Sequence, residues 1–214
     1  TRFRMPEPLA IYSIRGLILD RKLGNVQNLI MAQGRFALEA TVHRIKTLFN
    51  ICGPKNENKI FPDPNIPAIL QDLCAQAGIA SQILFNGNPH KSRFESQTAY
   101  SLRIERYEYV QKLCHQHEFV PIVLTNREVR NALTHIDERM ADILTKEEGV
   151  GWFVDYAASI RDALIPPPNV KRIEFCRTYI HNESLILHLG NELDLDALME
   201  ECTTALRVIF TLNH

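Results

Sequence analysis

Three residues in the middle of the chain carry side chains suited to acting on a phosphate ester: Arg130, Asn131 and His135. A histidine titrates near neutral pH, so it can give a proton to, or take one from, a reacting hydroxyl or a leaving oxygen. The guanidinium of an arginine holds a negatively charged phosphorane through two hydrogen bonds. Asn131 is suited to orienting the phosphate or the histidine. The set is therefore suited to acid–base chemistry at phosphorus.

The segment 126–148 must position these residues, and its pattern predicts an amphipathic helix. Asn126 is a plausible N-cap, and Gly149 closes the far end. At the helical repeat, Arg130 and His135 lie about 140° apart around the axis, too splayed for one compact pocket on an isolated helix. Two such helices packed about a two-fold axis bring Arg130 of one copy near His135 of the other. The geometry therefore favours a homodimer. The apolar stripe of the segment consists of Val129, Leu133, Ile136, Met140 and Ile143.

The run from Arg130 through Asn131 to His135 resembles the signature of the HEPN superfamily, in which an Arg and a polar residue, often Asn, precede a His. The resemblance implies a helical bundle with this motif on a late helix. Many members are metal-independent ribonucleases, often dimers whose two motif helices form one composite site. It therefore implies that Arg130, Asn131 and His135 are catalytic, that RNA is the substrate, and that the chain acts in a defence or toxin–antitoxin system. An antitoxin or a nucleotidyltransferase-like protein is the partner that such a system implies.

The alternative is a non-catalytic helical interaction or scaffold module, because other members of the superfamily are inactive scaffolds. In that hypothesis, the same polar face pairs with itself or with a partner protein. Asp137 stands where the toxin-like branch often has a Tyr, and an acidic group near the phosphate opposes substrate binding. The match covers about six residues directly and residues 1–150 only through the expected helical architecture.

Composition places the chain among ordinary globular proteins and excludes several classes of function. A formal net charge of -1 gives no global field that attracts nucleic acid or a membrane surface, so any such site must be local. The five cysteines are scattered and form no CxxC pair, which favours a reduced, cytoplasmic protein. No apolar run approaches the roughly 20 residues that span a bilayer. No motif for a dinucleotide, P-loop or hydrolase site is present, so we expect no cofactor.

The periodicity predicts a mainly α fold, an antiparallel helical bundle over residues 1–150. Residues 151–214 are expected to form an aromatic and proline-rich linker, a β-hairpin and a terminal helix as an appendage. The hairpin pairs 171–180 with 184–189, and Asp194 is expected to cap the last helix. The expected helices span 7–23, 26–50, 66–85, 92–117, 126–148 and 195–212.

The expected helix 92–117 offers a second place where nucleic acid would bind. Arg93, Arg103 and Arg106 alternate there with Tyr100, Tyr107 and Tyr109. Arginines beside aromatic rings are typical of surfaces on which bases stack. A solvated helix with half-buried tyrosine rings explains the same pattern.

The end of this helix places three potential metal ligands close together, Cys114, His115 and His117. A structural zinc ion needs four donors in a tetrahedral arrangement, and no second pair of ligands is present in the sequence. We therefore expect solvated histidines at a helix end and no metal site.

Overall fold

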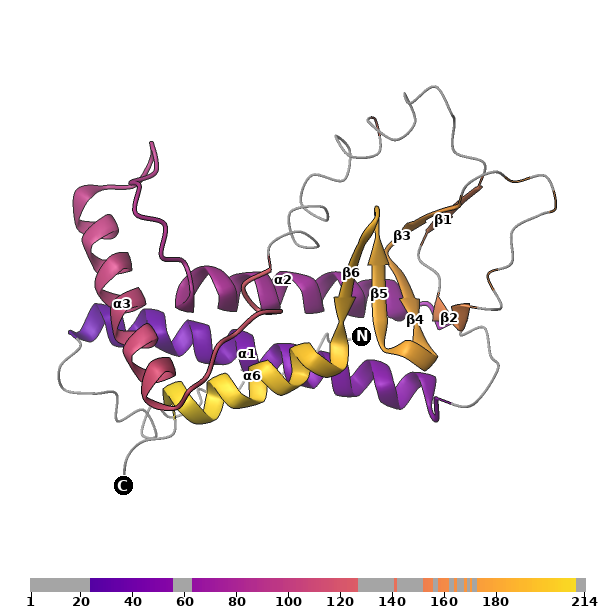
Figure 1. The fold of residues 1–214 in the computed structure, drawn as a ribbon, viewed down its shortest axis with the longest axis horizontal. Helices are drawn as coiled ribbons and strands as arrows, with labels where there is room; N and C mark the ends of the chain where they lie inside the picture. Colours follow the sequence, from indigo (N-terminus) through magenta and orange to yellow (C-terminus); the bar gives the residue numbers. More distant parts are fainter. Residues whose placement is uncertain are drawn as a thin grey trace, which may run out of the picture.

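The computed structural model describes residues 24–55, 63–126, 141, 152–155, 158–161, 164, 168, 170 and 173–210. This part of the chain is mainly helical, with a small sheet at one end of the helices (Figure 1). The helix expected at 7–23 lies outside the described residues. So does the helix expected at 126–148, apart from Asn126 and Ala141.

Two long helices, α1 (Asn25–Cys52) and α2 (Ile66–Leu84), run side by side in opposite directions (Figure 1). Both form because apolar residues recur at helical spacing, and their bounds agree with the predicted spans. Gly34 lies in the middle of α1, where a Cβ atom would approach Leu84 of α2 to 2.8 Å. The glycine therefore permits the close contact of the two helices. At Gly53 the backbone turns to a φ of 72°, which ends α1.

The two other described helices are α3 (Gln97–Gln116) and α6 (Leu195–Phe210). Ser96 caps α3, since its Oγ accepts a hydrogen bond from the amide of Ala99 at 3.1 Å. The prediction that this helix begins at residue 92 was therefore wrong. Asp194 caps α6 as predicted, with its Oδ1 3.0 Å from the amide nitrogen of Ala197.

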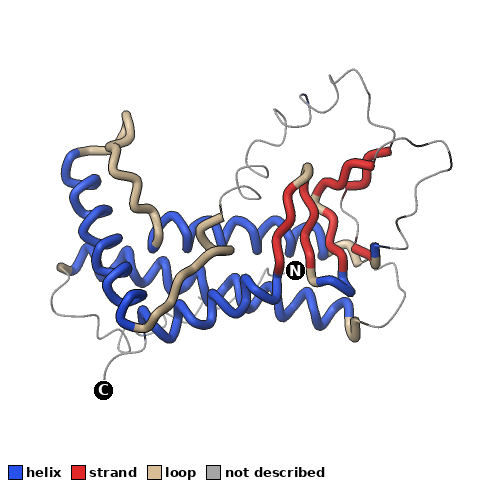
Figure 2. Tube along the Cα trace, in the orientation of Figure 1, coloured by secondary structure: helices blue, strands red, loops and turns tan. Residues whose placement is uncertain are grey.

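The sheet contains a hairpin at the predicted place and adds strands that the sequence pattern did not predict (Figure 2). The expected strand 171–180 is divided, because only its residues 178–180 pair with the strand at 185–188. β4 (Thr178–Ile180) pairs antiparallel with β5 (Leu185–His188), and β5 pairs antiparallel with β6 (Asn191–Asp194). A short 3-10 helix, η3 (His181–Glu183), forms the predicted turn of the hairpin.

Two further pairs of short strands are parallel. β1 (Trp152–Asp155) pairs with β3 (Ile173–Cys176), and β2 (Ala158–Ser159) pairs with β4. β3 and β4 are separated by Arg177 alone, whose φ of 48° lies in the left-handed region. The break at Arg177 is therefore where the chain passes from one sheet to the other.

One hydrophobic cluster joins the helices to the sheet. α6 packs against α1 and buries its apolar face, so the final helix belongs to the same packed layer as α1 and α2. The division of the chain at residue 150 stays a prediction, because residues 142–151 lie outside the described part. Fully buried members of the cluster include Leu38, Ile45, Leu48, Leu73, Leu84, Val110, Tyr179, Leu195 and Cys202.

All five cysteines are buried and carry free thiols. None of the helices in the described ranges combines the length and the apolar character that a membrane span requires.

Candidate functional site

The predicted catalytic residues Arg130, Asn131 and His135 lie outside the described residues, and so does Asp137. Their chemistry and mutual geometry stay predictions. The structure does describe the segment that immediately precedes them, and a separate polar cleft at the other end of α3.

The connector 119–126 leads from α3 to the predicted motif segment and is fixed to α6 by one carboxylate. Glu201 of α6 accepts the backbone amides of Ile122, Val123 and Leu124 at 2.8, 3.0 and 2.8 Å. The amide of Asn126 then closes a turn onto the carbonyl oxygens of Ile122 and Val123. Three amides bound to one charged group hold this backbone firmly. The chain therefore reaches residue 126 in a position determined by α6.

The space between the connector, α2 and α6 is nearly filled. A cavity of about 20 Å³ remains there, lined by residues that include Cys74, Ala77, Leu124 and Leu198. A volume of this size holds about one water molecule. This place is therefore a packing contact and not a ligand site.

A larger, open cleft of about 450 Å³ lies beside the loop 85–96, between α2 and α3. Its walls are mostly polar. They are formed by Gln82, Asn86, Asn88, His90, Ser92, Phe94, Glu95 and Arg103.

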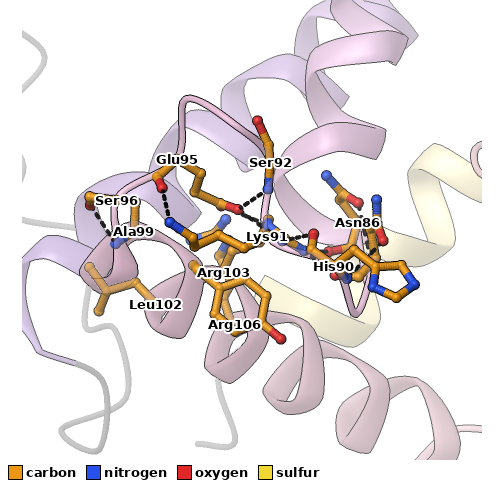
Figure 3. Close-up of polar contacts among 12 residues, drawn as sticks. Asn86, His90, Lys91, Ser92, Glu95, Ser96, Ala99, Leu102, Arg103 and Arg106 are labelled. Atoms are coloured by element: carbon orange, nitrogen blue, oxygen red, sulfur yellow. Dashed lines mark hydrogen bonds and ion pairs between the residues drawn. The ribbon is translucent and has the colours of Figure 1, made fainter.

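Arg103 organises this loop, and Figure 3 shows its side chain surrounded by loop residues. Its Nε and Nη2 donate to the two carboxylate oxygens of Glu95 at 2.9 and 3.1 Å. Nη1 donates to the carbonyl oxygens of Asn86 and Asn88, and Nη2 also donates to that of His90. These five bonds use all five N–H donors of a guanidinium. The hydrogen bonds from Arg103 also hold the pKa of Glu95 below its ordinary value.

Arg106 has a similar internal role. Its Nε donates to the carbonyl oxygen of Ile83 at 2.8 Å, and its Nη1 donates to Oε1 of Gln27 in α1 at 3.2 Å. Burial lowers the pKa of Arg106 from its ordinary value. Arg103 and Arg106 are 9% and 7% exposed, so neither offers a guanidinium to a ligand on the surface of α3.

The predicted stacking surface on this helix is therefore wrong for Arg103 and Arg106. The alternative explains the tyrosines better, because Tyr100, Tyr107 and Tyr109 are all partly buried. The physical reason is that α3 packs against the loop and α1 through the face that carries the two arginines.

The residue that sequence reasoning missed is Phe94. The expected helix 92–117 includes this residue, but Phe94 lies in the loop before α3 and is 91% exposed. The signal was present in the chain: Asn86-Gly87-Asn88-Pro89 marks a break, and Ser96 is as good a cap as Ser92.

The cysteine and histidines at the end of α3 do not converge. Cys114 is buried, and burial raises the pKa of its thiol to about 11, whereas His115 and His117 are exposed. Across the described ranges, no group of three or more histidine, cysteine or acidic side chains is arranged to hold a metal ion.

A buried histidine joins the sheet to the end of α1. His181 Nδ1 lies 3.0 Å from the hydroxyl of Tyr179, and its Nε2 lies 3.0 Å from the carbonyl oxygen of Gly53. The hydroxyl therefore donates to Nδ1, and Nε2–H donates to the carbonyl. Tyr179 and His181 are both at most 1% exposed, so this pair contacts no solvent-borne ligand and has a structural role.

Comparisons of the chain with protein-family models, with curated proteins and with solved structures return no match. The resemblance to the HEPN superfamily consequently rests on the motif at Arg130, Asn131 and His135.

Proposed function

We propose that this chain is a HEPN-like, metal-independent endoribonuclease that acts as a homodimer. The observation that carries the proposal is the sequence Arg130-Asn131 with His135 on the polar side of the predicted helix 126–148. A mainly helical fold and a firmly held entry to the motif segment support it.

In the proposed reaction, the 2′-hydroxyl of a ribose attacks the adjacent phosphorus, and the 5′-oxygen of the next nucleotide leaves. His135 takes the proton of the attacking hydroxyl or gives one to the leaving oxygen. Arg130 holds the extra negative charge of the phosphorane through paired hydrogen bonds, and Asn131 orients the phosphate or the histidine. The products are a 2′,3′-cyclic phosphate and a free 5′-hydroxyl.

Glu201 supports this proposal because its carboxylate holds the backbone of the connector 119–126. It fixes the backbone up to Leu124 on α6, and Arg130 follows only six residues later. A catalytic group must be held within about 0.5 Å of its working position, which requires rigid neighbours.

The test is degradation of a mixed RNA by the purified protein in EDTA, beside His135→Ala and Arg130→Ala. We expect cleavage by the wild type, 2′,3′-cyclic phosphate ends, and a loss of at least about 100-fold in each variant. His117→Ala and Arg207→Ala remove the same residue types from exposed positions on α3 and α6 and are expected to cleave normally. Absence of cleavage, or equal cleavage by all variants, contradicts the nuclease.

A second candidate, the non-catalytic interaction module, is favoured by Asp137 and by two exposed apolar residues in the connector. Val120 and Ile122 are 75% and 70% exposed, directly before the motif segment. Such residues fit a contact with a partner protein, for which we propose an antitoxin or a nucleotidyltransferase-like protein. A neighbouring gene for such a partner, together with an inactive wild type in the EDTA assay, distinguishes this candidate from the nuclease.

A further inference from the structure

Phe94 is the most exposed large hydrophobic side chain in the described part of the chain, at 91%. An aromatic ring held in water gains nothing for the stability of the fold. A nucleic-acid base can stack on the face of such a ring. Because single exposed apolar side chains are common on protein surfaces, the case for a binding site depends on the residues around Phe94.

The loop holds this ring on a well-ordered backbone. Oδ1 of Asn86 accepts the amide of Asn88, and Oδ1 of Asn88 accepts the amide of His90. The amide of Phe94 itself donates to Oγ of Ser92 at 3.4 Å. Together with Arg103, these bonds fix the loop before any ligand arrives, which lowers the entropy cost of binding.

A close contact with α3 fixes the start of the same loop. A Cβ atom at Gly87 would lie 2.3 Å from Cζ of Tyr107 and could not be accommodated without displacement. The loop backbone thus packs directly on a tyrosine ring, and the phenol of Tyr100 donates to the carbonyl oxygen of Pro89 at 2.8 Å.

The charges around Phe94 are positive. Glu95 is neutralised by Arg103, which leaves Lys91 and Arg93 as exposed cations on the loop. The guanidinium carbon of Arg93 lies 5.6 Å from the centre of the Phe94 ring. Lys91 uses one of its three N–H donors on the carbonyl oxygen of Glu95 at 3.0 Å. An exposed ring with one cation over its face and a second cation on the same loop combines a stacking surface with charges that attract phosphate.

The cleft beside the ring adds groups that recognise base edges. Gln82 carries an amide and His90 a ring, both are exposed, and both line the cleft. Amides and imidazoles donate to and accept from the edges of unpaired bases. Arg103 has no spare donor, so it shapes the cleft and does not bind the ligand.

We propose that the loop 86–95 is a binding site for single-stranded RNA, in which Phe94 stacks on one base and Lys91 and Arg93 contact the phosphates beside it. The proposal deepens the proposed function and rests on RNA being the substrate. Duplex RNA is disfavoured, because its bases are stacked on each other and present no free face.

The test measures binding in full-length His135→Ala, which is expected to bind RNA without cleaving it. A fluorescent single-stranded RNA of about 12 nucleotides is titrated by anisotropy, with a duplex of the same length as comparison. Phe94→Ala in this background is expected to weaken binding by about 5- to 150-fold, since one stacked base contributes that much. Phe94→Trp restores binding, because it also offers a ring face.

Matched controls come from exposed residues outside the loop. Phe36→Ala removes another exposed aromatic side chain, from α1, and Lys112→Gln removes an exposed cation from α3. Neither is expected to change binding. The logarithm of the RNA association constant falls linearly with the logarithm of the salt concentration. Lys91→Gln and Arg93→Gln are each expected to make this slope less steep by about 0.7, because each removes one phosphate contact. Lys112→Gln is expected to leave the slope unchanged.

Three outcomes overturn the proposal: no RNA binding, equal binding by Phe94→Ala and Phe36→Ala, or a preference for the duplex. If the loop binds a protein instead, Phe94→Ala leaves RNA binding unchanged. The proposal and the nuclease fail separately. Phe94-dependent binding without cleavage by the wild type contradicts only the nuclease, and cleavage with Phe94-independent binding contradicts only the loop.

Discussion

Arg103 shows how a single buried side chain determines the shape of a surface. Its guanidinium bonds to Glu95 and to three backbone carbonyl oxygens, and thereby holds together a loop that makes no regular secondary structure. A planar fork with five donors suits such a site, whereas an ammonium group offers three donors at a single point. The surface presented by the loop therefore depends on an arginine that does not itself bind a ligand.

Replacing Arg103 by lysine is a direct test of this role. Arg103→Lys leaves at least two acceptors without their donor, and we expect the free energy of unfolding to fall by about 1–3 kcal/mol. RNA binding by the loop is expected to weaken as well, because Phe94 loses its fixed backbone. Chemical denaturation and anisotropy titration measure the two effects.

The control for Arg103 is Arg35→Lys, at a partly exposed arginine that pairs with Glu39 in the same helix. An exposed pair of this kind contributes little to stability. Equal stability of the two variants would contradict the organising role of Arg103.

At the scale of elements, Glu201 connects α6 to the entry of the predicted motif segment. Three backbone amides share its two carboxylate oxygens. The amide side chain of a glutamine offers only one acceptor oxygen and directs an NH₂ group at the remaining N–H. The carboxylate is thus the group that this turn requires.

Glu201→Gln is therefore expected to lower the free energy of unfolding by about 1–3 kcal/mol and to slow RNA cleavage. Glu200→Gln makes the same change at the neighbouring exposed position and is expected to have no effect. For each variant, chemical denaturation measures the free energy of unfolding, and an assay in EDTA measures the rate of RNA cleavage. If Glu201→Gln cleaves RNA as fast as Glu200→Gln, the connector does not position the catalytic residues.

The sequence predicted several elements whose signal is local, but it missed β6, which forms a tight hairpin with β5. α1, α2 and α6 follow from their apolar periodicity, and the β4–β5 hairpin follows from alternation around a short turn. β1 and β2 were not predicted, because strands of four and two residues with parallel partners are specified by distant contacts.

The start of α3 shows how a tertiary contact overrides a local pattern. Residues 92–96 are compatible with a helix in sequence, but Arg103 binds Glu95 and three carbonyl oxygens of the loop, which holds this stretch outside the helix. This contact cannot be inferred from spacing. As a result, Phe94 lies in an exposed loop and not in the helix expected at 92–117. The catalytic assignment at Arg130 and His135 stays a prediction from the sequence.

At the scale of the whole molecule, α3 lies in the chain between the loop with Phe94 and the connector to the predicted motif segment. Under the two proposals, the loop holds the RNA while the motif residues act on it.

The proposed homodimer is the other feature at the scale of the whole molecule. Because Arg130 and His135 diverge on the predicted helix 126–148, the proposed site takes Arg130 from one copy and His135 from the other. A heterodimer of two differently inactivated chains then contains one complete site.

The most direct test of the central claim is therefore a mixing experiment in EDTA. Arg130→Ala and His135→Ala are each expected to be inactive, and their 1:1 mixture after subunit exchange is expected to cleave RNA at about one quarter of the wild-type rate. Half of the dimers in such a mixture are mixed, and each mixed dimer has one of its two sites intact. A mixture that stays as inactive as its components, although size measurements show exchanged dimers, would contradict the composite active site.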